Sequence, residues 1–158
     1  MLKGYIEGYY GRLFSEDERA KVINHMGKLK MDFYLYGPKE DLYHRIEWEK
    51  TYPAKEQKAL RSLVDGCKKN RIKPIFAISP GLQCSKLTKN FIKTLTSKLK
   101  QAQQLGFNDF AIFFDDIEHK KDKELAKFHL TIINLVSSID FLKKNSLIVN
   151  SSQGGGTK

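Results

Sequence analysis

The sequence predicts an α/β fold built from parallel β/α repeats, with about four units followed by a fifth strand. Short apolar runs alternate regularly with longer stretches whose apolar residues recur at helical spacing. Glycine- and proline-containing breaks follow several of the short runs. Because regular alternation requires crossover connections, the strands are expected to be parallel, with right-handed crossovers. The pattern alone does not separate an open doubly wound sheet from part of a barrel. A full eight-unit barrel takes about 250 residues, and this chain has 158.

The first half of the chain contains a well-marked helix start. Residues 3–7 and 31–36 are expected to form strands, with a helix running from Ser15 to about Leu29 between them. Ser15 and Glu18 have the capping-box spacing, in which each side chain accepts a hydrogen bond from the backbone amide of the other residue. The residues expected on the buried face of this helix are Val22, Met26 and Leu29.

The second half repeats the alternation. Pro53 suits the first turn of the next helix, and Gly106 suits the position that follows the third helix. The buried stripe expected on the second helix is Leu60, Leu63, Val64 and Cys67. The remaining expected elements are a strand at 72–78, a helix at 88–105, a strand at 110–114, a helix at 123–143 and a strand at 146–150. Residues 1–150 are therefore expected to form one domain, with 151–158 as a flexible tail.

Composition and charge restrict the classes of partner. The formal net charge is +10, but the lysines are spread over the polar faces of several predicted helices. We therefore expect a solvated basic surface and no nucleic-acid partner. No apolar run approaches the roughly 20 residues that span a bilayer, and the first residues show no secretory leader. No membrane partner and a cytoplasmic location are expected.

Metal and cofactor chemistry is not indicated. The two cysteines, Cys67 and Cys84, have no metal-ligand spacing and make no disulfide framework. His44 has no second histidine at ligand spacing. Apart from the carboxylate pair considered below, the sequence therefore predicts no metal site, and it predicts no cofactor.

The candidate chemistry follows the fourth strand, where the apolar run 110–114 stops at two adjacent carboxylates, Asp115 and Asp116. In parallel folds, ligands bind at the carboxyl ends of the strands. From the residues alone, three interpretations stay open. They are a polar strand end or turn, a magnesium site as in receiver-like phosphotransfer domains, and an acid/base pair whose environments drive the two pKa values apart. No phosphate-cradling glycine loop supports the second.

Other polar and aromatic residues are expected at the same edge. Lys39 directly follows a strand-ending Gly-Pro pair, which favours the rim over an ordinary surface position. Glu7, at the end of the first strand, is either a buried ion-pair partner or a site carboxylate, and the ion-pair interpretation is favoured. Tyr43 and Trp48 are expected to pack the long loop before Pro53. The mixture of polar groups and aromatic rings suits a sugar.

Five segments, taken in chain order, resemble one family. They are residues 6–12, 34–41, 44–45, 78–81 and 113–117. Each is expected at a strand end, and together they resemble the catalytic domain of family 84 of the glycoside hydrolases, the O-GlcNAcases and bacterial β-N-acetylglucosaminidases. The resemblance extends to about Val149. It implies a (β/α)8 barrel of the TIM type, of which this chain would form the first half, a partial TIM barrel.

The resemblance also implies an activity and roles for individual residues. The family hydrolyses terminal β-linked N-acetylglucosamine with retention, through a substrate-assisted oxazoline mechanism. By resemblance, Asp115 would hold the acetamide N–H of the sugar, and Asp116 would be the general acid and then the general base. Gly8, through its backbone, and Lys39 match positions that contact sugar hydroxyls. The implied partner is an N-acetylglucosaminide on a glycoprotein or an oligosaccharide.

The chain departs from the family pattern at its fifth strand. Residues 148–153 stand where the family has a segment whose tyrosine contacts the substrate, and the later sugar-binding strands have no counterpart. Leu13-Phe14 stands where the family usually has Pro-Trp. The first and fifth strands would be exposed edges, which favour self-association or a complementing chain. Two functions are therefore weighed: a β-N-acetylglucosaminidase in truncated form, and a non-catalytic sugar-binding or regulatory fragment that keeps the acetamide half of the site.

Overall fold

The computed structural model describes residues 1–80, 88–114, 122–139 and 147–150. This part of the chain alternates strictly between strands and helices. In chain order the elements are β1 (Gly4–Glu7), α1 (Glu16–Lys28), β2 (Phe33–Tyr36), α2 (Ala54–Lys69), β3 (Lys73–Ile78), α3 (Lys89–Gln104), β4 (Asp109–Phe113), α4 (Asp122–Ser138) and β5 (Leu147–Asn150). The strands form one parallel sheet in the order β1-β2-β3-β4-β5.

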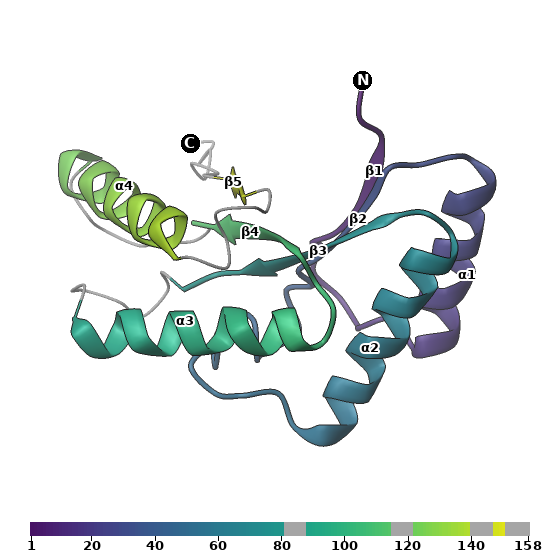
Figure 1. Ribbon diagram of the computed structural model, residues 1–158, viewed down its shortest axis with the longest axis horizontal. Coiled ribbons are helices and arrows are strands. Elements are labelled where there is room, and N and C mark those ends of the chain that lie inside the picture. Colours follow the sequence, from purple (N-terminus) through teal and green to yellow (C-terminus); the bar gives the residue numbers. More distant parts are fainter. Residues whose placement is uncertain (81–87, 115–121, 140–146, 151–158) are drawn as a thin grey trace.

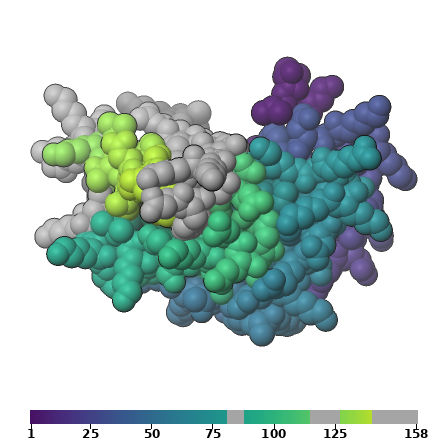
Figure 2. All heavy atoms as spheres, viewed as in Figure 1, coloured from purple at the N-terminus to yellow at the C-terminus, as the bar shows by residue number. Residues whose placement is uncertain are grey.

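This strand order identifies the sheet as part of a barrel. A doubly wound sheet reverses its order at a switch point and places helices on both faces, whereas here each new strand is added on the same side of the previous one. All four helices contribute to one apolar core with the outward side chains of the strands; its members include Ile23, Val64, Leu95 and Ile132. Figure 1 shows the helices following one another around the strands from α1 to α4, and the colours at the surface run in the same order (Figure 2). The prediction of a partial (β/α) barrel is confirmed.

The opposite, inner face of the sheet carries its own small cluster of Leu35, Ile75, Ala77, Ala111 and Phe113. The register aligns Ile6 with Leu35, and Leu35 with Ile75. Along this row the exposed fraction falls from 54% for Ile6 to 3% for Leu35 and 2% for Ile75. The inner face is therefore more open at β1 than at β2 and β3.

The first helix begins as predicted, and its buried face is predicted in part. Ser15 and Glu18 form the complete capping box. The buried residues are Arg19, Ile23 and Met26, and Leu29, expected in the core, is 55% exposed at the end of the helix. Met26 is thus buried as predicted, and Val22 is partly buried against the core. The apolar pattern missed Arg19 because that residue is charged.

The later elements agree more closely with the sequence pattern. Leu60, Leu63, Val64 and Cys67 are buried on α2, and Gly106 has a φ of +104° after α3. Pro53 is the residue that precedes α2 and not part of its first turn. The fourth helix ends at Ser138, short of the expected residue 143. Residues 140–146 and the predicted tail 151–158 lie outside the described residues.

A buried ion pair joins β1 to α1. Both oxygens of the Glu7 carboxylate accept from the Arg19 guanidinium, at 2.7 and 3.0 Å. The Tyr34 hydroxyl donates a third hydrogen bond to Glu7 at 2.5 Å. Glu7 is 1% exposed and Arg19 is 7% exposed. The interpretation of Glu7 as a structural ion-pair partner is thus confirmed.

Replacing Arg19 with methionine is expected to destabilise the fold by about 3–5 kcal/mol, because the Glu7 carboxylate would be left charged and buried. The matched control is Lys50→Met, which removes a surface pair with Glu47 and is expected to change stability by less than about 1 kcal/mol. Urea unfolding followed by circular dichroism measures both. Equal losses in the two variants would contradict this account of the buried pair.

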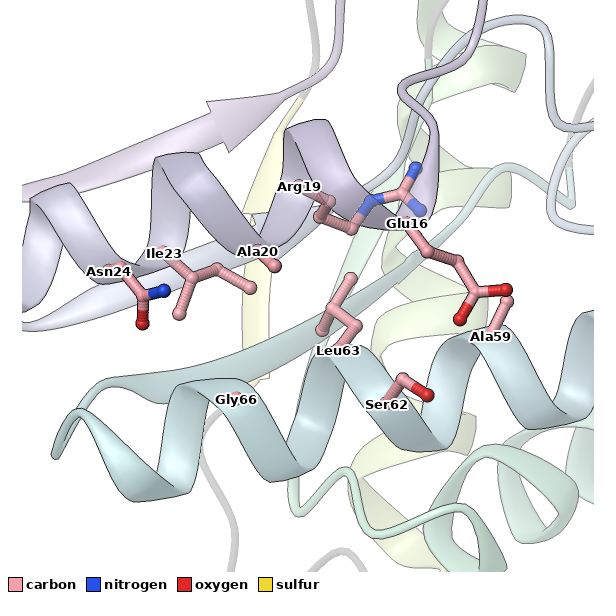
Figure 3. A pocket seen from close by; sticks show the side chains of 9 residues that line it. All are labelled: Glu16, Arg19, Ala20, Ile23, Asn24, Ala59, Ser62, Leu63 and Gly66. Atoms are coloured by element: carbon pink, nitrogen blue, oxygen red, sulfur yellow. The ribbon is translucent and has the colours of Figure 1, made fainter.

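Small residues line the seam between α1 and α2. Ala20, Ala59 and Gly66 border a cavity of about 70 Å³, and the side chains of Ile23 and Leu63 extend into the same space (Figure 3). Within the described part of the chain, a Cβ added at Gly66 would meet the side chain of Ile23 at 3.8 Å, which is ordinary van der Waals contact. The seam therefore has room for one more methyl group.

We expect Gly66→Ala to stabilise the protein by roughly 1 kcal/mol, because alanine loses less backbone entropy than glycine in a helix. The new methyl group would also fill part of the seam. Thermal unfolding measures the change. A lower melting temperature would show that the two helices cannot accept the added Cβ.

Candidate active site

The loops after β1 and β2 meet at the carboxyl edge of the sheet. The amide of Gly37 donates to the carbonyl of Glu7 at 3.0 Å, and the amide of Lys39 donates to the carbonyl of Tyr9 at 3.3 Å. These bonds extend the contact between the two chain segments past the ends of both strands. The structure therefore brings together Gly8 and Lys39, two of the residues singled out from the sequence.

Lys39 lies at this edge among aromatic rings. It is 9% exposed, and its Nζ is 5.9 Å from the ring centroids of both Tyr10 and Phe113. The guanidinium of Arg45 lies on the same Tyr10 ring, 5.8 Å from its centroid. Cations at such distances are attracted to the ring faces. The prediction that Lys39 lies at the rim is confirmed, although the side chain is more buried than a typical rim lysine.

Glycine is needed at position 37 for this arrangement. A Cβ there would lie 2.8 Å from the Cβ of Ala77 and 2.9 Å from a ring carbon of Phe113. Such contacts are too close for any side chain. The absence of a Cβ lets the Phe113 ring pack against the β2 backbone, where it reaches the Lys39 ammonium.

The two carboxylates predicted to do the chemistry, Asp115 and Asp116, lie outside the described residues. The last described residues before them are Phe113, which ends β4, and Phe114, which is 3% exposed. The expected buried strand is therefore confirmed, although it ends at Phe113 and Phe114 is buried just beyond it. The roles of Asp115 and Asp116 stay predictions.

A buried carboxylate that the sequence did not single out organises the loop between β2 and α2. Asp41 is 5% exposed and accepts from the hydroxyls of Tyr36 and Tyr52, at 2.6 and 2.7 Å, and from the amide of Tyr43 at 2.8 Å. Burial is the main reason why the pKa values of the Tyr36 and Tyr52 hydroxyls are raised, so both keep the proton that they donate. The only available sequence signal was an acidic residue in a loop rich in tyrosine.

The aromatic residues of the same loop pack as expected. Trp48 is 3% exposed and meets Phe91 edge-on, with ring centroids 5.2 Å apart. Tyr43 lies 5.3 Å from Tyr52, centroid to centroid. The loop is therefore anchored to the core at both of these points.

Lys98 on α3 is a second buried polar residue that sequence reasoning missed. Its Nζ donates to the carbonyl of Lys50 at 2.5 Å and lies 4.1 Å from the Tyr52 ring centroid. Burial lowers the pKa of the Lys98 ammonium to about 8. Lys98 was not predicted to be buried, because lysine is rarely buried in proteins and is normally assigned to the solvent-facing side of a helix.

Two cavities in the helical layer are separate from the predicted site. The seam cavity described above lies between α1 and α2, and a larger one of about 400 Å³ lies between residues 13–16, residues 40–43 and the start of α2. Neither Gly8 nor Lys39 lines them. Within the described ranges, no group of three metal-binding side chains gathers. No helix in the same ranges has the length and apolar character to cross a bilayer.

We expect Lys98→Met to remove a pH-dependent part of the stability. The folded-state pKa of about 8 lies below the unfolded value of 10.5, so between these values the unfolded chain binds more protons and stability rises with pH. The free energy of unfolding of the wild type, relative to that of the variant, should therefore increase from pH 8 to 10. Urea titrations at several pH values measure this difference, and parallel curves would contradict it.

Comparisons with known proteins agree with this geometry. The sequence profile described as beta-N-acetylglucosaminidase matches residues 3–148. The O-GlcNAcases of Rattus norvegicus and Mus musculus are each 37% identical over 127 residues, which is 78% of this chain and 14% of theirs.

Solved structures extend the match to the fold. CpGH84B has a TM-score of 0.77 and 31% identity, over 94% of this chain and 26% of that one. A variant O-GlcNAc hydrolase from Thermobaculum terrenum has a TM-score of 0.78 and 28% identity, over 94% of this chain and 34% of that one. This chain thus spans only part of the length of each relative. Its matched residues, strand order and loop positions show that it belongs to the β-N-acetylglucosaminidase family.

Proposed function

We propose that this chain carries part of the active site of a glycoside hydrolase that removes terminal β-linked N-acetylglucosamine. The observation that carries the proposal is the meeting of Gly8 and Lys39 at the carboxyl ends of neighbouring strands. Family membership supports it, since the names of the relatives describe O-GlcNAc hydrolysis. The substrate is an N-acetylglucosaminide of a glycoprotein or an oligosaccharide, and the proposed setting is the cytoplasm.

The proposed reaction divides the work between two carboxylates and the sugar itself. The acetamide oxygen of the substrate attacks the anomeric carbon while the bond to the leaving oxygen breaks, and Asp116 gives its proton to that oxygen. Asp115 accepts the acetamide N–H and stays charged, which stabilises the positive charge of the oxazoline intermediate. Asp116 then takes a proton from the water that attacks the anomeric carbon, which opens the oxazoline and retains the configuration.

Lys39 and Gly8 are proposed to hold the sugar during both steps. An ammonium offers three hydrogen-bond donors, and the exposed ring of Tyr10 beside it offers apolar surface for the C–H faces of a pyranose. Among the described residues, a Cβ at Gly8 would approach Ile6 and the Gly37 carbonyl, at 3.1 and 4.0 Å. Glycine leaves this space free, so a hydroxyl can come close to the backbone.

A second candidate function follows from the open sheet. In the described part of the chain, β1 and β5 are its edges, and a TIM barrel needs further strands between them. Residues 1–150 are proposed to form a partial barrel domain, with 151–158 outside it. A second copy or a complementing chain would add at the edges. Without one, the chain would act as a sugar-binding or regulatory fragment that keeps the acetamide half of the site.

A chromogenic β-N-acetylglucosaminide tests the catalytic proposal directly. The purified protein is expected to release the chromophore, and Asp116→Ala to lower kcat/KM by roughly 10²–10⁴-fold, because proton transfer to the leaving oxygen is lost. Asp65→Ala, which removes an exposed acid on α2, is the matched control and should keep full activity. Wild-type turnover no faster than that of Asp116→Ala would end the catalytic proposal.

Calorimetric titration with an N-acetylglucosamine-derived thiazoline, a stable mimic of the oxazoline, separates the two functions. Saturable binding without turnover would support the sugar-binding fragment. Absence of both would exclude both functions for this chain. Light scattering on the same samples shows whether binding or turnover belongs to a monomer or to an associated form.

A further inference from the structure

The turn that carries Lys39 is closed by one carbonyl that accepts two hydrogen bonds. The amide of Asp41 donates to the Pro38 carbonyl at 3.0 Å, which closes a β-turn with Lys39 and Glu40 in its central positions. The Nε2 of His44 lies 2.6 Å from the same oxygen. A backbone carbonyl has two lone pairs, so both are used immediately before Lys39.

The partner atom fixes the protonation of the His44 ring. A carbonyl oxygen can only accept, so Nε2 must carry the proton. No described residue accepts a hydrogen bond from Nδ1. A proton on Nδ1 would therefore be buried without a partner, so the ring is neutral with Nδ1 deprotonated. Burial lowers the pKa of His44, in agreement with this neutral form. The ring is fully buried, and the bond from Nε2 to Pro38 is therefore shielded from competing water.

His44 also connects the turn to the third strand. Its backbone carbonyl accepts from the amide of Ser79 at 2.9 Å. Ser79 directly follows β3 and is 1% exposed. The bond from Asp41 only closes the turn, whereas His44 fixes the turn relative to the sheet.

We propose that His44 is the positioning residue of the sugar site: its Nε2–H holds the Pro38 carbonyl and so fixes the backbone from which Lys39 reaches the substrate. This rests on the proposed function insofar as Lys39 contacts the sugar. The placement of Lys39 between Tyr10 and Phe113 is measurable without any sugar. The placement of Lys39 by His44 and the contact of Lys39 with the sugar can therefore be tested and refuted separately.

Two amide substitutions test the position of the donor. The side-chain nitrogen of glutamine can replace Nε2 of histidine, whereas that of asparagine reaches only about as far as Nδ1. His44→Gln should keep the bond to Pro38, and His44→Asn should lose it. Both variants keep a neutral polar group, and thermal unfolding identifies any general loss of stability. The pair remains informative even if a third variant, His44→Leu, does not fold.

Nuclear magnetic resonance gives the first measurement. The ε-methylene protons of Lys39 are expected to carry ring-current shifts from Tyr10 and Phe113, relative to those of the exposed Lys58. These shifts should persist in His44→Gln and collapse toward the Lys58 values in His44→Asn. Ring ¹⁵N spectra of the wild type should show the proton on Nε2. A proton on Nδ1, or unchanged Lys39 shifts in His44→Asn, would overturn the proposal.

Binding of the thiazoline gives the second measurement. His44→Asn should weaken binding by about 10-fold, which is the loss expected when one charge-assisted hydrogen bond is misplaced. His44→Gln should stay within about 3-fold of the wild type. In a Lys39→Met background, His44→Asn should have no further effect, because His44 acts through Lys39. Additive losses in the double variant would show that His44 serves only the fold and would overturn the positioning role.

A wild type that binds no thiazoline would refute the proposed function and the sugar-related part of this proposal. The Lys39 shifts would then still decide whether His44 fixes the Lys39 turn.

Discussion

The parallel ladder between consecutive strands is the constraint on which the rest of the structure depends. Each described strand pairs only with its neighbours in the chain, so every crossover turns the same way and every helix packs on the same face. The described strands therefore all end at one edge, where the loops after β1 and β2 meet. The proximity of Gly8 and Lys39 follows from this, because the bonds from Gly37 to Glu7 and from Lys39 to Tyr9 continue the β1–β2 pairing past the strand ends.

Buried polar groups then fix the loops that the ladder brings together. Glu7 and Arg19 hold the end of β1 against α1, Asp41 ties the loop after β2 to two tyrosines, and His44 joins that loop to β3. A buried polar group without a partner is costly, so each of these contacts disfavours other loop conformations. These contacts hold the backbone around Lys39 in one conformation. The Lys39 ammonium can bind a sugar hydroxyl only if its position is fixed.

The proposed chemistry needs this rigidity more than it needs a large pocket. In a substrate-assisted reaction the nucleophile belongs to the sugar, so the protein must hold the ring and the acetamide in one geometry. The small residues at Gly8 and Gly37 and the ring of Phe113 shape the edge of the sheet where the sugar would lie. The two cavities of the helical layer take no part in this edge.

The sequence alone was sufficient to predict much of the fold and the family of this protein. The alternation of apolar runs, the Ser15–Glu18 capping box and the stripe from Leu60 to Cys67 depend on local spacing, and the motifs at the strand ends were sufficient to indicate the family. The order of the strands and the burial of charged residues do not follow from local spacing, and only the tertiary structure showed them. The strand order separated a barrel from a doubly wound sheet. Partners on other elements explain why Arg19 and Lys98 are buried, and the fold packs Tyr36 and Tyr52 around Asp41. A charged residue is buried only when the fold supplies its partner, and no local pattern shows where that partner will lie.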